Sequence, residues 1–303
     1  MCGGFSVSTH NFIPTVWAAR LLQNLQNNLV YGQTGVVNND YEGEIRELGD
    51  SVKILSIGSI EIGDYARNQD MDPPQVLDDA GTTLIIDHSR YFNFYVDNLD
   101  RVQANPARMD AAMQEAGYAM ANDTDKWLAE KMVAEAGNSA TGNGGGNIIG
   151  TDANPIQLGL GSSDKNAYEL LVDLSTKMDE ANLPPEGRYV IVSPWVHGLL
   201  LKDGRFTNYG TEANRDTLQR GRIGSVAGMT VLRSNNVPVR GGSKWKIIAS
   251  HSMCTTLATQ FTRIVGYEPE KRFGDAVKGL KLEGAKVTRP SGVIVATVSK
   301  GTI

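Results

Sequence analysis

The hydrophobic and polar residues along this chain change their spacing several times, and each spacing predicts a different element. The longest helical period lies between residues 106 and 136, where Met113, Met120 and Trp127 recur on one face of the pattern. Asn105 and Pro106 suit the first turn of a helix, and Gly137 suits its end. We therefore predict one long helix of about 45 Å that packs along one face.

Ahead of this helix the pattern changes to alternation, which is typical of β-strands. Apolar residues alternate with polar ones at Val52 and Ile54, at Ile60 and Ile62, and again at Leu84, Ile86, Phe92, Phe94 and Val96. The stretch between the two sets holds Pro73-Pro74, which cannot continue a hydrogen-bonded ladder. The pattern predicts a long antiparallel hairpin over residues 44–97.

Behind the helix, the spacing indicates a mixed helix-and-strand unit. A glycine-rich link at 138–150 is followed by a helix that Asp164 would cap, a buried strand at 188–192 and a second helix opened by Ser193-Pro194. Strands are then expected at 229–233 and 245–249, and the remaining stretch is strand-rich. The fold class predicted from these periods is α+β.

The first forty residues carry a short amphipathic pattern. Leu21, Leu25 and Leu29 recur every four residues, which favours a helix with one apolar side. This segment could dock on its own domain or pack on a neighbouring copy, and the residues leave both alternatives open.

Composition narrows the class of protein. The chain has 303 residues, 41% of them hydrophobic, and a formal net charge of −5. That charge argues against a general affinity for nucleic acid or for an anionic membrane, so any contact with DNA should be weak and non-specific. Two cysteines are too few for a disulfide framework, and no apolar run approaches the ~18 residues of a spanning helix. The sequence predicts a soluble, unexported protein of about two packed units.

Charge is distributed unevenly between the hairpin and the tail. Fourteen acidic and four basic residues lie between positions 40 and 100, whereas eight basic and four acidic residues lie from position 260 onward. Opposite charges of this kind could pair within one chain or between copies.

Residues that could carry out catalysis or hold a metal do not form a recognisable set. His10, His88, His197 and His251 lack the spacing that gathers a metal ion, and the two cysteines are far apart. Ser193 lacks the flanking glycines of a nucleophile elbow, so a role at the start of a helix is the better interpretation. No catalytic residue, cofactor site or metal site is predicted, and a cytosolic enzyme is the weaker alternative.

Several short sequence motifs, in a particular order, resemble those of the major capsid proteins of tailed bacteriophages, which have the Hong Kong 97-type fold. The similarity is to the branch often compared with the coat protein of phage P22, which is common in phages of actinobacteria. The motifs are IPTVW at 13–17, RLL at 20–22, DYEGEI at 40–45, GDSVKI at 49–54, FNF at 92–94 and RFGDAVKGL at 272–280.

The resemblance implies a division of the chain into the parts of that fold. Residues 1–43 would be the N-arm, 44–97 the extended E-loop, 98–150 the P-domain with its spine helix at 106–136, 151–250 the A-domain and 251–303 returning P-domain strands.

The resemblance also implies a structural protein that assembles into pentamers and hexamers of an icosahedral head around double-stranded DNA. Only about 43 residues precede the hairpin, so a separate scaffolding protein is expected, with a portal and a decoration protein as further partners. Assembly would occur in the bacterial cytoplasm. An encapsulin-like cargo shell has the same fold and is the nearest alternative.

In such shells the E-loop of one subunit lies over the P-domain of the next, which would bring acidic and basic groups together. The residues expected at this interface are Asp64, Arg67, Asp70, Asp72, Asp78 and Asp79 on the hairpin, and Arg263, Lys271, Arg272 and Lys278 on the tail.

Overall fold

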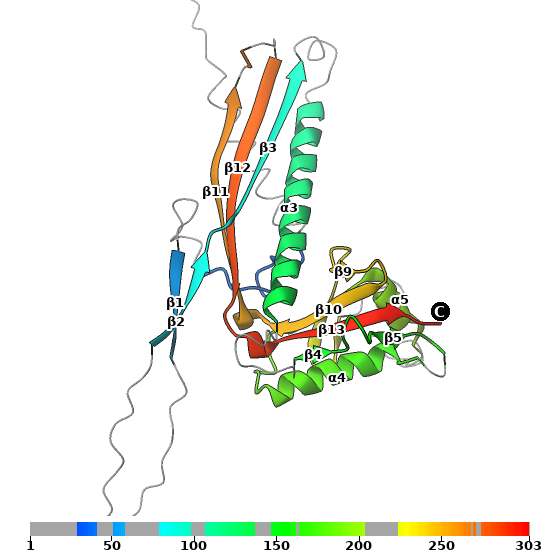
Figure 1. The fold of residues 1–303 in the computed structure, drawn as a ribbon. Helices are drawn as coiled ribbons and strands as arrows, with labels where there is room; N and C mark the ends of the chain where they lie inside the picture. The colour runs from blue at the N-terminus through cyan, green and yellow to red at the C-terminus, as the bar shows by residue number, and fades with distance from the viewer. Residues whose placement is uncertain are drawn as a thin grey trace, which may run out of the picture.

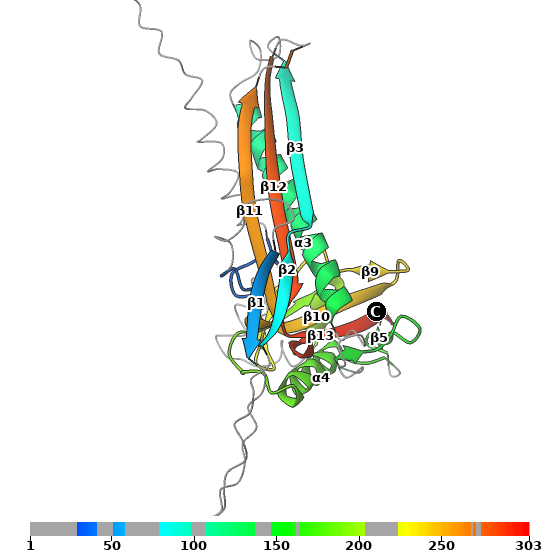
Figure 2. The same ribbon diagram turned by 60° about the vertical axis from the view of Figure 1, so that its left-hand side comes forward.

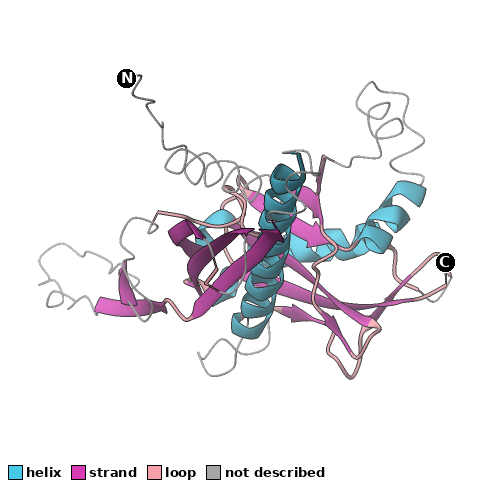
Figure 3. Ribbon diagram, turned by 90° about the horizontal axis from the view of Figure 1, so that it is seen from above, coloured by secondary structure: helices cyan, strands magenta, loops and turns pink. Residues whose placement is uncertain are grey.

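The structure, a computed structural model, describes residues 29–40, 51–57, 79–97, 107–136, 147–161, 164–203, 224–267, 269–270 and 274–302. In this part of the chain a tall three-stranded sheet stands on a wider eight-stranded sheet, and a two-stranded hairpin lies beside the foot of the tall sheet (Figures 1 and 2). Seen from above, the long helix α3 lies between the tall sheet and the wider one (Figure 3).

Helix α3 (Ala107–Glu135) confirms the long helix predicted over residues 106–136. It contains many good helix formers and no internal proline. Side chains four, seven or eight positions apart are buried along one side, namely Met113, Met120, Leu128 and Met132. Asn105, Pro106 and Gly137, which were expected to begin and end the helix, lie outside the described residues.

The tall sheet consists of β11 (Thr255–Tyr267), β12 (Gly274–Val287) and β3 (His88–Asp97), antiparallel and in the order β11-β12-β3. Alternate side chains face α3, where Phe92 and Ile264 pack around Met113 and Val277. Gly279 lies opposite Phe92, and a Cβ at this position would collide with the aromatic ring. A glycine is therefore required for the ring to lie flat on the strand.

The hairpin is shorter than predicted. Its strands, β1 (Ser51–Ile57) and β2 (Asp79–Ile85), pair antiparallel, and Ile54 and Leu84 pack on Leu282 at the foot of the tall sheet. The chain then passes into β3, which pairs with β12.

The prediction that Phe92, Phe94 and Val96 belong to the hairpin was therefore wrong, because alternation identifies a strand but not its partner. Ile60, Ile62 and Pro73-Pro74 lie outside the described residues.

The wider sheet has the order β4-β13-β10-β6-β8-β7, with β5 beside β13 and β9 beside β10. Its strands are β4 (Ile148–Ile149), β5 (Ile156–Leu158), β6 (Arg188–Val192), β7 (Ser225–Val226), β8 (Met229–Arg233), β9 (Val239–Arg240), β10 (Lys244–His251) and β13 (Val293–Lys300). Helices α4 (Ala167–Glu180) and α5 (Pro194–Lys202) complete this unit, and α4 contacts β13 and α5. The helix-and-strand unit expected behind the long helix is confirmed.

Two details of this unit differ from expectation. The strands of residues 251–303 divide between two sheets. β11 and β12 belong to the tall sheet, whereas β13 lies beside β10 in the wider sheet. The run from Val293 to Val298 is buried throughout, which suits a strand in the interior of the wider sheet, between β10 on one side and β4 and β5 on the other. The expected grouping of 251–303 into one set of strands was wrong.

Asn166 caps α4 in place of Asp164. The Oδ1 atom of Asn166 accepts a hydrogen bond from the Tyr168 amide at 2.8 Å. The Asp164 carboxylate instead accepts the Thr302 amide at 2.7 Å and so fastens the end of the chain. Both residues are good caps, so the sequence alone could not separate them.

A buried polar cluster joins α3 to the tall sheet, and we use this name for Thr124, Lys281, Glu283 and His88. Glu283 accepts hydrogen bonds from the Thr124 hydroxyl at 2.8 Å and from His88 Nδ1 at 3.0 Å, and Lys281 forms an ion pair with it. Lys281 and Glu283 are each 1% exposed. The His88 ring stacks on Trp127 of the helix at 4.4 Å.

Glu283 remains ionised in this cluster. Burial alone would raise the pKa of its carboxyl, but the His88 hydrogen bond and the Lys281 charge outweigh burial and lower the pKa below its usual range. The carboxylate is therefore the acceptor on which the other three side chains converge.

The substitution Glu283→Gln should lower the free energy of unfolding by about 3 kcal/mol, because it removes the carboxylate that forms an ion pair with the buried Lys281 ammonium. Urea unfolding followed by tryptophan fluorescence measures the change. Glu130→Gln on α3, which breaks an exposed ion pair with Arg240 of β9, serves as control and should cost about 1 kcal/mol or less. Equal losses in the two variants would contradict this assignment.

Candidate functional site

Of the described histidines, His88 and His251 have hydrogen-bond partners within the fold, and His197 is buried in α5. His88 lies in the buried cluster, and His251 accepts the Met253 amide through Nδ1 and contacts the Glu186 carbonyl through Nε2 at 2.6 Å. Nowhere in the described ranges do three His, Cys, Asp or Glu side chains gather in a way that could hold a metal ion. None of the helices described there is both long and apolar enough to span a membrane. Surfaces are therefore the candidate functional features.

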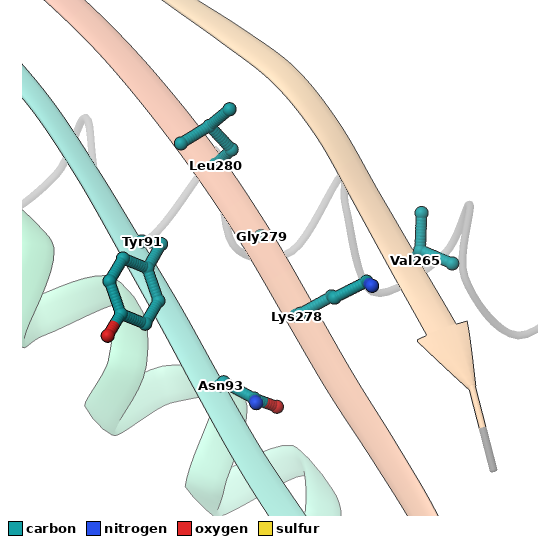
Figure 4. Close-up of a pocket in the computed structure, with 6 residues that line it drawn as sticks. All are labelled: Tyr91, Asn93, Val265, Lys278, Gly279 and Leu280. Atoms are coloured by element: carbon teal, nitrogen blue, oxygen red, sulfur yellow. The ribbon is translucent and has the colours of Figure 1, made fainter. Parts of the chain in front are cut away.

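The face of the tall sheet that points away from α3 is one such surface. Alternation turns Tyr91 and Asn93 of β3, Lys278 and Leu280 of β12 and Val265 of β11 toward this side (Figure 4). Together with Gly279 they line a hollow of about 490 Å³, which we call the outer groove.

The outer groove combines exposed apolar surface with an ordered polar rim. Tyr91 is 79% exposed and Leu280 is 38% exposed, so two large side chains lie open to solvent beside each other. Lys278 Nζ lies 4.7 Å from the centre of the Tyr267 ring, and the Tyr267 hydroxyl donates to Asn93 Oδ1 at 3.2 Å. Three strands thus hold one rim in place, as suits contact with another polypeptide.

The structure places one of the predicted interface side chains, Lys278, in the outer groove. Asp79 and Arg263 lie in β2 and β11, but the structure does not describe their side chains. The other predicted interface residues lie outside the described residues, namely Asp64, Arg67, Asp70, Asp72, Asp78, Lys271 and Arg272. The pairing of an acidic hairpin with a basic tail therefore stays a prediction.

Several basic residues of the tail have partners within the subunit. Lys281 lies in the buried cluster, Lys286 pairs with Glu135 of α3 at 3.1 Å, and Lys300 lies over the rings of Trp195 and Trp245. The positive charge that the tail presents to a partner is therefore smaller than its composition indicates.

The second feature is the attachment of the N-terminal segment. Residues 29–38, which we call the arm root, lie against α3 and β11. The Asp125 carboxylate accepts the backbone amides of Val30 at 2.9 Å, Tyr31 at 3.1 Å and Gly32 at 3.4 Å. Asn38 then pairs with β11, accepting the Leu257 amide and donating to the Thr255 carbonyl.

Burial dominates the electrostatics of this attachment. Burial raises the pKa of the Asp125 carboxyl to about 6, although the three amides and the Lys281 charge act in the opposite direction. Burial, followed by the charge of Asp125, also raises the pKa of the Tyr31 hydroxyl well above its ordinary value. Asp125 is 1% exposed, so its hydrogen bonds are shielded from water.

Little in the residue pattern indicates the roles of Asp125 and Glu283. The polar run at 122–126 looks like an interruption of the helix's apolar stripe, yet Thr124 lies four residues after Met120 and four before Leu128. This spacing places Thr124 on the buried face of α3, and it is the feature of the sequence that indicates a buried polar contact there. Nothing in the spacing identifies the arm amides as the partners of Asp125.

These features belong to a structural protein of the Hong Kong 97-type capsid fold, with a spine helix on a tall sheet, an α/β unit at its foot, a projecting hairpin and surfaces suited to contacts between copies. A family model described as phage capsid protein matches residues 82–296, and the chain belongs to this family. It is a structural major capsid protein that forms a homo-oligomeric shell in the virion.

Solved structures of phage capsids are similar over most of the chain. A structure from Mycobacterium phage Che8 has a TM-score of 0.65 at 25% identity, over 86% of this chain and 88% of that chain. The capsid of Ralstonia phage GP4 has a TM-score of 0.64 at 15% identity, over 86% of each chain. The capsid of cyanophage P-SCSP1u has a TM-score of 0.63 at 15% identity, over 88% of this chain and 86% of that one. No curated protein matches the chain.

The raised pKa of Asp125 predicts a pH-dependent difference between the wild type and Asp125→Asn. The folded chain holds the Asp125 proton up to about pH 6, whereas the ordinary value is 3.8, so this group stabilises the fold most at low pH. Relative to the variant, the wild type should lose up to about 3 kcal/mol of unfolding free energy between pH ~4 and ~7. Urea unfolding at several pH values measures this difference, and parallel stability curves would contradict it.

Proposed function

We propose that the subunit assembles into pentamers and hexamers, which close into an icosahedral head around double-stranded DNA. The observation that carries this proposal is the capsid family match over residues 82–296, which spans the tall sheet, the spine helix and nearly all of the wider sheet.

The parts of the fold are assigned from the same family. The β1–β2 hairpin is the E-loop, α3 with β3, β11 and β12 is the P-domain, and the wider sheet with α4 and α5 is the A-domain. Residues 1–43 are assigned as the N-arm.

The outer groove is the proposed seat of a neighbour's hairpin. It lies on the P-domain, exposes Tyr91 and Leu280, and carries the Lys278 charge on its rim. The segment that joins the two hairpin strands contains Asp64, Asp70 and Asp72, so its charge is complementary to that rim. Single exposed pairs contribute about 0–1 kcal/mol, but repeated contacts around a shell would favour the correct register.

The remaining partners follow from the same assignment. A separate scaffolding protein guides closure, a portal occupies one vertex and a decoration protein binds outside. Packaged DNA is contacted weakly, as the net charge of −5 supports, and assembly takes place in the host cytoplasm. A cargo shell of the encapsulin type is not favoured, because the family match and the similarity to the Che8 structure are to phage proteins.

Electron microscopy and sedimentation of the chain expressed alone, and then together with its scaffolding partner, test this proposal. Closed icosahedral shells, or open sheets that close once the scaffolding protein is added, are the expected result. A chain that stays monomeric under both conditions would overturn the proposed assembly.

The double reversal Arg272→Glu and Lys278→Glu should yield a folded monomer that does not form shells, because it places negative charge opposite the acidic hairpin of the neighbour. Circular dichroism reports the fold, and microscopy reports assembly. Lys126→Glu, which reverses an exposed charge on α3, is the control and should leave shell formation intact. Normal shells from the double variant would rule out this charge pairing.

A further inference from the structure

The arm root is attached to the body of the subunit by buried side chains as well as by hydrogen bonds. Tyr31 is fully buried, and Val36 and Val37 belong to the main hydrophobic core. The Gln33 carbonyl accepts the amides of Val36 and Val37, closing a tight turn. These contacts hold residues 31–38 against the body of the subunit.

The part of the arm root nearest the N-terminus is held differently. Leu29 packs on Met120 and Ala121 of α3, and the next three amides all point at one carboxylate. Charge-assisted hydrogen bonds to successive amides fix the direction of a backbone as well as its position, because each bond constrains a separate peptide plane. The Asp125 contacts therefore set the direction in which the preceding chain leaves α3.

The chain ahead of this point is long enough to matter for assembly. Twenty-eight residues precede Leu29, and they would span about 40 Å as a helix and at most about 100 Å when extended. The extended length is about twice that of α3, whose 29 residues span about 43 Å, so a change of direction at the arm root is magnified at the far end of the arm.

We propose that Asp125 is the positioning residue that aims the N-terminal arm at a neighbouring subunit, so that shells close only when the carboxylate holds the amides of residues 30–32. This inference rests on the proposed assembly into shells. The arm is the partner-reaching segment, the partner is a second copy of this chain, and Asp125 acts through the arm backbone without touching the partner itself.

Asp125→Asn tests the anchor directly. The asparagine amide replaces one acceptor oxygen by a donor, which would face a backbone amide that also donates. Hydrogen exchange read by mass spectrometry should show the amides of residues 30–32 exchanging about tenfold faster or more, while β10 and β13 are unchanged. Closed shells should be lost or malformed under conditions in which the wild type forms them.

Two further variants separate aiming from folding. Asp123→Asn lies on the same helix and breaks an exposed ion pair with Arg90, and it should change neither arm exchange nor shell closure. A chain lacking residues 1–28 keeps Asp125 and the arm root, and it should fold yet fail to close shells. Normal shells from this truncated chain would overturn the proposal even if Asp125→Asn does not fold.

Three results would overturn the proposal. Arm exchange could be unchanged in Asp125→Asn, arm exchange could rise while normal shells form, or the truncated chain could close shells as the wild type does. Failure of the wild type itself to assemble with its scaffolding partner is a different result, because it refutes the proposed shell and not the anchor.

Discussion

The polar contact between Thr124, on the buried face of α3, and the ion pair in β12 of the tall sheet is the constraint on which the rest of the structure depends. An apolar helix can slide or rotate on an apolar sheet at small cost, whereas a buried ion pair with its hydrogen bonds has one acceptable arrangement. Lys281 and Glu283 of β12 meet Thr124 of α3 in that arrangement. The cluster thus fixes the register of a helix of 29 residues against a strand of 14.

Other parts of the subunit are attached to the same helix from several sides. Asp123 binds Arg90 of β3, Lys131 binds Asp87 between β2 and β3, and Glu130 binds Arg240 of β9. Glu135 accepts both the Lys286 ammonium and the Val287 amide of β12. These pairs are exposed or half-buried, so each contributes little alone. Because the cluster fixes α3, they fix the hairpin base and the wider sheet relative to the helix.

Much of this fold could be predicted from spacing, because spacing reports local structure. The helical period predicts α3, and runs rich in β-branched residues predict β6 and β13 as strands. The partner of a strand is a long-range choice that alternation does not encode, so Phe92 and Phe94 were assigned to the hairpin although β3 pairs with β12. The resemblance to phage capsid proteins supplied the family, but it did not identify Asp125 or the buried cluster.

The buried polar residues were missed for a physical reason. A charged residue is normally placed on the surface, since burying a charge costs several kcal/mol unless partners surround it. Those partners come from elements distant in sequence, as with Asp125 and the amides of residues 30–32, about 95 positions away. A polar side chain in phase with an apolar stripe is the signal that such partners exist, and Thr124 carries it.

The division between buried and exposed side chains also bears on how a shell subunit can be stable and yet bind other copies. The charges that fix the fold are enclosed beneath α3, whereas Tyr91 and Leu280 remain exposed on the opposite face of the same sheet. The described side chains of the two-stranded hairpin pack on the tall sheet through Ile54 and Leu84, and an isolated pair of strands is at best marginally stable. The hairpin is therefore suited to gain stability by packing on a surface of another copy. In the proposed assembly the same sheet separates the two tasks, with the buried charges on the face toward α3 and the outer groove on the face toward solvent.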